Sequence, residues 1–279
     1  MVSPALDTPG IRLRAEELLA LREAVPPPGR ARPTTRRPGA VPAAPAGAGV
    51  DLREIRAFTE GDDARRMDPA ATARTGTPHI RSFHEDRDDA LLLIADFRPP
   101  MLWGTGAALR SVRAARALAR RGWQAAAGGA SLAAIGIDAA GAAFVPLGSG
   151  VSQMDRISHM LASRHDQALA AGGDVPSLAA VLTRAARLAP PGASVLIATE
   201  PEGIAPEDER PLAQLARRRR VRLVLALDPL DRAPPRLALP VHAGGLRRVA
   251  RLRPLDDGAL TKRLAGLNVA LEMVADDAE

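Results

Sequence analysis

Acidic residues stand where three apolar segments of this sequence end. Asp96 closes the segment 90–95, Glu200 follows the segment 194–199, and Asp228 follows the segment 222–227. Each segment has the length and apolar character of a strand covered on both faces. Because ligands of doubly wound sheets bind at the carboxyl ends of the strands, these carboxylates are the first candidates for a functional site. Carboxylates at such an edge can bind a cation or pair with arginine.

Hydrophobic periodicity predicts the elements that must position these residues. Strands are predicted at residues 79–85, 90–96, 131–137, 142–145, 194–199, 222–227 and 237–242, and helices at residues 108–121, 151–170, 177–188, 207–219 and 257–275. The alternation of strands and helices predicts an α/β fold with a doubly wound, mostly parallel sheet.

The N-terminal part of the chain has a different composition. Residues 11–24 carry apolar side chains at near-helical spacing, which predicts a short amphipathic helix. Residues 25–50 are rich in Pro, Gly and Ala and predict a flexible arm. We therefore expect the helix and the Pro/Gly-rich arm in residues 1–50 and the α/β domain in residues 51–279.

Composition argues against several functional classes. The 279 residues include no cysteine, which excludes disulfides, thiolate metal sites and cysteine nucleophiles. All aromatic residues precede position 145, far from the basic run at residues 217–220, so stacking on nucleic-acid bases is not expected. We therefore expect no nucleic-acid partner. Binding of nucleic acid through arginine charge alone is a weaker hypothesis. The sequence has no 18-residue apolar stretch and no secretory signal, which predicts a soluble, cytoplasmic protein without membrane insertion.

A charged block lies upstream of these candidate strand ends. It contains Arg56, Phe58, Gly61, Asp62, Asp63, Arg65, Asp68, Ala73 and Arg74. Together with residues 91–96, and more weakly with residues 196–200, this block resembles the DUF58 family, whose signature reads R-x-Y-x-x-G-D-D-x-R-x-I-D-W-x-x-x-A-R. Pro69 stands where the family has tryptophan. The resemblance implies a sheet of von Willebrand factor A type and a protein-binding adaptor that partners a MoxR-type AAA+ ATPase, rather than an enzyme.

The resemblance also implies a metal-ion-dependent adhesion site, in degenerate form, at Asp96. Sites of that type use an Asp-x-Ser-x-Ser loop together with a later hydroxyl and a later acidic residue, and magnesium prefers about six hard oxygen ligands. Here Arg98 and Pro100 replace the two serines. We therefore expect no metal site and no cofactor, with the Arg98 guanidinium bridging Asp96 and Glu200 in place of the cation. The alternative is that Arg98 faces solvent while Asp96 caps a turn.

Two functional hypotheses follow from these residues. In the first, a partner-binding surface contacts a MoxR-type AAA+ ATPase and a client protein through Asp96, Arg98, Glu200, Asp62, Asp63, Arg65 and Arg74. The charged block can also be interpreted as a purely structural turn, with its two aspartates paired against Arg65 and Arg74. In the second hypothesis, the protein is a magnesium-dependent protein-ligand binder that uses Asp96, Ser177 and Glu200.

No catalytic residue is predicted. Gly104-Thr105-Gly106 lacks the third glycine of a dinucleotide-binding loop, and Ser149 does not lie in a Gly-x-Ser-x-Gly motif. The basic run at residues 217–220 ends a predicted helix that begins with acidic residues, an arrangement that suits the helix dipole. A patch for phosphate or an acidic partner is the alternative interpretation of that run.

Overall fold

The computed structural model describes residues 7–25, 52–59, 62–83, 89–171, 173–243 and 246–274. These residues form two compact units. The small unit comprises the described residues from 52 to 83, and the large unit comprises residues 7–25 together with the described residues from 89 to 274. Of the Pro/Gly-rich segment at residues 25–50, expected as an arm, residues 26–50 lie outside the described residues.

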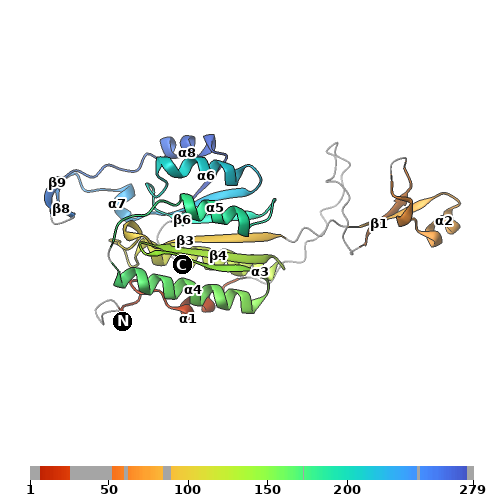
Figure 1. The fold of residues 1–279 in the computed structure, drawn as a ribbon, viewed down its shortest axis with the longest axis horizontal. Coiled ribbons are helices and arrows are strands. Elements are labelled where there is room, and N and C mark those ends of the chain that lie inside the picture. Colours follow the sequence, from red (N-terminus) through yellow and green to blue (C-terminus); the bar gives the residue numbers. More distant parts are fainter. Residues whose placement is uncertain are drawn as a thin grey trace. The chain divides into compact units, whose positions relative to one another are not determined.

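The large unit is built on a six-stranded sheet (Figure 1). Its strands are β3 (Ala90–Asp96), β4 (Ser131–Asp138), β5 (Gly141–Gly148), β6 (Ser194–Thr199), β7 (Arg220–Ala226) and β10 (Ala270–Val274). They stand in the order β10-β7-β6-β3-β4-β5, and all neighbours are parallel except β5, which runs antiparallel to β4. The predicted α/β fold with a mostly parallel sheet is therefore confirmed.

Helices cover both faces of this sheet (Figure 1). One face carries α1 (Ala15–Ala20), α3 (Arg110–Ala127) and α4 (Val151–Ala170), and the other carries α5 (Ala179–Leu188), α6 (Pro206–Ala216) and α8 (Asp257–Gly266). Along β3, Leu91 and Leu93 pack with the first layer of helices, whereas Leu92 and Ile94 pack with the second. Burial on both sides explains why this strand is continuously apolar.

None of the helices within the described ranges combines the length and the apolarity that a bilayer crossing requires. The cytoplasmic location and the absence of membrane insertion stay predictions.

The N-terminal segment packs on the large unit. Leu13 and Leu18 are buried in its core, and the Trp123 indole of α3 donates a hydrogen bond to the Leu18 carbonyl at 2.9 Å. Gly10 has φ of 82°, and a side chain there would place its Cβ 2.2 Å from the Ala107 carbonyl oxygen. The expected division at residue 50 separates this helix from the sheet, whereas in the structure the two belong to one unit.

The C-terminal region differs from the helix predicted at residues 257–275. Helix α8 ends at Gly266, Asn268 has φ of 58°, and the chain continues as strand β10 beside β7. Leu271 packs on the α8 side of the sheet and Val274 on the α3 side. A short apolar run of this kind fits both the helical and the strand period. Hydrogen bonding to the edge of β7 makes it a strand.

The chain between β7 and α8 forms a separate hairpin. After the short helix α7 (Pro229–Arg232), strands β8 (Leu239–Ala243) and β9 (Leu246–Ala250) pair antiparallel with each other. A strand was predicted at residues 237–242, but as part of the main sheet. The structure shows a two-stranded sheet of its own.

The small unit pairs β1 (Leu52–Ala57) antiparallel with β2 (His79–Phe83), with the 3-10 turn η2 (Ala64–Arg66) and helix α2 (Pro69–Thr75) between them. Asp68 caps α2 by accepting a hydrogen bond from the Ala71 amide, and it also pairs with Arg81. Pro69, which replaces the family tryptophan, lies in the first turn of α2. Backbone N–H groups there have no hydrogen-bond partner within the helix, so proline removes no helical hydrogen bond.

Candidate functional site

Asp96 and Arg98 form a buried ion pair at the carboxyl edge of the sheet. Asp96 is the last residue of β3, and its side chain accepts hydrogen bonds from Arg98 Nε at 2.9 Å and Nη2 at 2.7 Å. The Arg98 amide also donates to Asp96 at 2.9 Å. The two residues are only 1% and 3% exposed. The expected pairing of these residues is therefore present, and the alternative of a solvent-facing Arg98 is wrong.

The same guanidinium joins two further loops. Its Nη1 donates to the Pro176 carbonyl before α5 at 2.6 Å, and its Nη2 donates to the Gly203 carbonyl after β6 at 2.7 Å. Burial by itself disfavours the charged form, but the hydrogen bonds and charge of Asp96 outweigh that effect and raise the pKa of Arg98. The charged guanidinium thus ties three loops at one edge of the sheet.

Thr199 completes the surroundings of Asp96 and was not singled out from the sequence. It is the last residue of β6, and its hydroxyl donates to Asp96 at 2.6 Å. Gly203 passes so close that a Cβ there would lie 2.0 Å from the Thr199 hydroxyl, which explains the glycine. A hydroxyl at the end of the strand that pairs with β3 is the signal that could have revealed this contact.

The donor set around Asp96 does not fit a divalent cation. Both carboxylate oxygens already accept hydrogen bonds from protein donors, and a fixed positive charge lies against them. Within the described ranges, no three carboxylate or imidazole side chains gather as possible metal ligands. A cation at Asp96 would have to displace the guanidinium of Arg98.

Ser177 and Glu200 have their own partners. The Ser177 hydroxyl donates to the buried Asp208 at 2.6 Å and accepts a hydrogen bond from the Ala179 amide at the start of α5. Glu200 accepts a hydrogen bond from the Glu202 amide at 3.0 Å. Burial raises the pKa of the Glu200 carboxyl. The expected bridge from Arg98 to Glu200 is therefore replaced by contacts of Arg98 with backbone carbonyls.

A second network, centred on the buried Asp228, lies at the same edge. We call its residues the Asp228 cluster: Thr105, Arg110, Arg113, Asp228 and Asp231. Asp228 accepts hydrogen bonds from the Thr105 amide at 2.7 Å and from its hydroxyl, and Arg113 lies 3.8 Å away. Arg110 pairs with Asp231. Burial opposes the charge on Asp228, but the hydrogen bonds from Thr105 lower the pKa of this carboxyl. The Gly-Thr-Gly loop is thus held by an ion-pair network.

The charged block lies in the small unit, where Asp62 is not paired as expected. Its carboxylate accepts hydrogen bonds from Arg56 at 2.9 and 2.6 Å and from the Thr59 amide and hydroxyl, each at 2.8 Å. These contacts, chiefly that with Arg56, lower the pKa of the Asp62 carboxyl. The alternative pairing of Asp62 with Arg65 and Arg74 is therefore wrong. Arg56, on β1 six residues before Asp62, pairs with the carboxylate instead.

Asp63 caps the turn η2 by accepting a hydrogen bond from the Arg65 amide at 3.0 Å. The side chains of Asp63, Arg65 and Arg74 are exposed. The candidate residues thus fall into a paired group at the sheet edge of the large unit and a charged block in the small unit.

His165 supports the loop that carries Arg98. The ring of Phe97 packs edge-on against the imidazole with 5.3 Å between ring centroids. The Leu13 amide donates to His165 Nδ1 at 3.4 Å, so Nε2 carries the proton and donates to the Ser111 hydroxyl at 2.9 Å. The fully buried imidazole therefore links α4, α3, the N-terminal segment and the loop after β3.

Acidification is expected to destabilise the protein through His165. Burial lowers the pKa of this imidazole from 6.5 to about 4, against a smaller opposing effect of Asp166. The unfolded chain takes up this proton below pH 6.5 while the folded protein does not, so stability falls as the pH drops from 6.5 towards 4, by on the order of 3 kcal/mol. Chemical denaturation between pH 7 and pH 5 measures this slope. His165→Gln should flatten it, and an unchanged slope would contradict the assignment.

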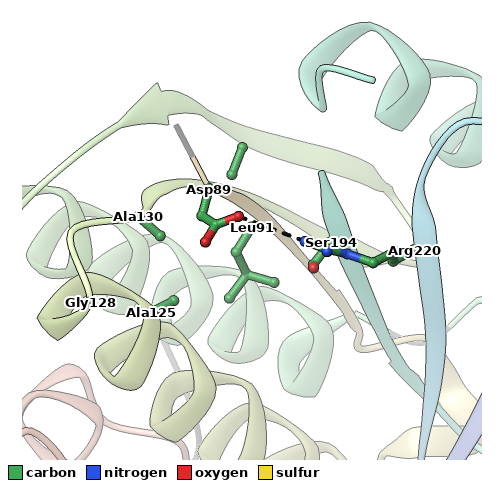
Figure 2. Close-up of a pocket in the computed structure, with 8 residues that line it drawn as sticks. Asp89, Leu91, Ala125, Gly128, Ala130, Ser194 and Arg220 are labelled. Atoms are coloured by element: carbon green, nitrogen blue, oxygen red, sulfur yellow. Dashed lines mark ion pairs between the residues drawn. The ribbon is translucent and has the colours of Figure 1, made fainter. Parts of the chain in front are cut away.

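A hollow of about 240 Å³ lies at the opposite, amino-terminal edge of the sheet. It lies between the end of α3 and the starts of β3, β6 and β7 (Figure 2). Its charged residues, Asp89 and Arg220, form an exposed ion pair at 3.8 Å, and small side chains such as Ala125 and Ala130 line the rest. None of the candidate residues lines it.

Sequence comparison places the chain in a family. The DUF58 family, described as proteins of unknown function, matches residues 54–241, and the chain belongs to it. The match includes the charged block and Asp96, which confirms the membership predicted from those residues.

Two mycobacterial relatives are described as uncharacterized proteins. The chain is 30% identical over 186 residues to the proteins Rv1480 of Mycobacterium tuberculosis strain H37Rv and Mb1516 of Mycobacterium bovis. These matches cover 66% of this chain and 57% of each relative, so the chain spans little more than half of their length.

Two solved structures are similar to part of the chain. They are an aerotolerance-related membrane protein from Bacteroides fragilis, with a TM-score of 0.43, and the conserved hypothetical protein BatB from Bacteroides thetaiotaomicron, with a TM-score of 0.42. Each is 14% identical, and the matches cover 67% of this chain and 92% and 90% of those chains.

Proposed function

We propose that this chain is a non-enzymatic, protein-binding adaptor with a sheet of von Willebrand factor A type. Its partners are a MoxR-type AAA+ ATPase and a client protein. In the large unit, the proposed contacts lie at the carboxyl edge of the sheet, which the buried Asp96 and Arg98 organise and the half-buried Glu200 borders. In the small unit, the proposed contacts lie on the charged block. Membership of the DUF58 family and the mostly parallel sheet support this proposal.

The buried pair of Asp96 and Arg98 is the observation behind the proposal. In a metal-ion-dependent adhesion site, the carboxylate after the first central strand binds a cation. Here arginine supplies the positive charge from within the chain, and Thr199 takes up further hydrogen-bonding capacity of Asp96. An edge organised in this way acts through fixed shape and charge rather than through metal coordination.

Accessible side chains in the loops after β3 and after β6 offer contacts to a partner. Trp103, in the loop after Arg98, is 38% exposed, and its ring stacks on the Arg110 guanidinium at 4.2 Å. Glu202, in the loop whose carbonyl holds Arg98, is exposed. Such a rigid aromatic residue beside a charged rim is typical of protein-binding surfaces.

Binding to a purified MoxR-type ATPase from the same cell, with and without ATP, tests the proposal. Glu202→Arg reverses an exposed charge at the proposed contact and is expected to weaken binding by about tenfold. Glu23→Arg makes the same change at an exposed position after α1 and is expected to leave binding unchanged. An absence of binding in both nucleotide states, or equal losses in the two variants, would refute the proposal.

The alternative proposal is a magnesium-dependent protein-ligand binder that uses Asp96, Ser177 and Glu200. It requires that magnesium displace Arg98 from Asp96 and that Ser177 leave Asp208. Partner binding that needs magnesium and is abolished by a chelator would favour this alternative. Binding that is insensitive to a chelator would favour the adaptor that acts without metal.

A further inference from the structure

The hairpin of β8 and β9 lies apart from the helical layers of the large unit (Figure 1). It is a two-stranded sheet between α7 and α8, and within the described part of the chain its strands pair with no strand but each other. Isolated two-stranded hairpins contribute little stability through their own packing. This element is therefore a candidate for contact with something outside the chain.

The hairpin segment, residues 232–255, contains only a few types of residue. It contains the six arginines Arg232, Arg236, Arg247, Arg248, Arg251 and Arg253. Apart from these arginines and His242, every residue of the segment is Ala, Pro, Leu, Val or Gly. The segment thus combines positive charge with aliphatic side chains and has no acidic, hydroxyl, amide or aromatic side chain.

The described side chains of the segment present both features to solvent. Leu237 is 77% exposed and Val249 is 74% exposed, values that are unusual for large aliphatic residues in a folded protein. Arg251 and Arg253 are also exposed. The exposed apolar and basic side chains therefore occur on one small projecting element.

These arginines differ from those of α3, which is equally poor in acidic residues. Arg110 pairs with Asp231 and Arg121 pairs with Glu272, so their charges are balanced within the fold. Among the described residues, no carboxylate forms an ion pair with Arg251 or Arg253. The charges of Arg251 and Arg253 are thus available to an external anion.

We propose that the β8–β9 hairpin docks the protein peripherally on an anionic lipid bilayer. Guanidinium groups bind lipid phosphates through paired hydrogen bonds, while the aliphatic side chains of Leu237 and Val249 enter the headgroup region. Arginine can also bind guanine and nucleic-acid phosphates, but nucleic acid fits the segment less well. Single-strand binding uses aromatic side chains, which the segment lacks, and a phosphate backbone offers no apolar contact to the exposed Leu237 and Val249.

Co-sedimentation of the full chain with vesicles tests this proposal. We expect the protein to bind phosphatidylglycerol-rich vesicles and not vesicles of phosphatidylcholine alone, with binding that weakens as salt is added. Arg251→Gln combined with Arg253→Gln should weaken binding by about thirtyfold, because each basic residue near an anionic surface strengthens binding by roughly fivefold. Leu237→Ser combined with Val249→Ser should weaken it several-fold without changing the net charge.

The control is Arg217→Gln combined with Arg218→Gln, which removes two exposed charges at the end of α6 and should leave vesicle binding nearly unchanged. Circular dichroism checks that each variant is folded. Equal losses in the hairpin and control variants would mean attraction by net charge alone and would overturn the proposal. A failure to bind anionic vesicles, or tighter binding to duplex DNA that the serine variant leaves intact, would also overturn it.

Discussion

Replacing Arg98 with methionine is expected to lower the free energy of unfolding by about 3–5 kcal/mol, the usual effect of breaking a buried ion pair. The variant leaves the Asp96 carboxylate buried without its cation and leaves the carbonyls of Pro176 and Gly203 without their donor. Chemical denaturation near neutral pH measures the loss. It should far exceed that of neutral substitutions at exposed arginines such as Arg218, because surface ion pairs contribute little.

The double variant Asp96→Asn with Arg98→Met separates the charge from the packing. Since the amide needs no counter-charge, this variant should recover part of the stability lost in Arg98→Met. Thr199→Val is expected to cause a smaller loss, of about 1–3 kcal/mol, because it removes one buried hydrogen bond to Asp96. If Arg98→Met proved as stable as the parent chain, the buried pair would not organise this edge.

Replacing Asp228 with alanine is expected to destabilise the protein by about 3–5 kcal/mol. Asp228 accepts hydrogen bonds from the Thr105 amide and hydroxyl and from the Leu230 amide, and it lies beside the buried Arg113. Its removal leaves these donors without their acceptor and the buried Arg113 without a nearby negative charge. Hydrogen exchange should show faster opening of the loop around Thr105, in addition to the loss of global stability.

Asp228→Asn serves as the matched variant, because it keeps the shape and part of the hydrogen bonding while removing the charge. Its effect should lie between those of the parent chain and Asp228→Ala. Asp257→Ala changes an exposed carboxylate at the start of α8 and should cause a much smaller loss. Equal losses in Asp228→Ala and Asp257→Ala would contradict the role assigned to the Asp228 cluster.

The central elements of the fold could be predicted because local pattern and tertiary environment agree. The segment 90–96 is continuously apolar and forms a strand buried on both faces, and the helix predicted at residues 151–170 has the bounds observed for α4. The segment 270–274 could not be assigned from periodicity, because it becomes a strand only through pairing with β7. Edge strands carry a weaker pattern than central ones.

The site could be predicted only as far as neighbours in sequence determine it. Asp96 and Arg98 are two residues apart, so their pairing followed from the chemistry of one loop. Thr199 reaches Asp96, and Thr105 reaches Asp228, across more than a hundred residues. Those contacts depend on the order of strands in the sheet and on the path of loops, which hydrophobic spacing does not specify. Arg65 is nearer to Asp62 in sequence than Arg56 is and carries the same charge, so spacing alone does not identify Arg56 as the partner of Asp62.

Titration calorimetry with magnesium tests most directly whether arginine has taken the place of a cation at the sheet edge. The full parent chain should release no heat attributable to a stoichiometric site, because the Arg98 guanidinium saturates the Asp96 carboxylate. Arg98→Ser combined with Pro100→Ser restores the two missing hydroxyls and serves as the comparison. Stoichiometric magnesium binding by the parent chain that disappears in Asp96→Asn would contradict the account.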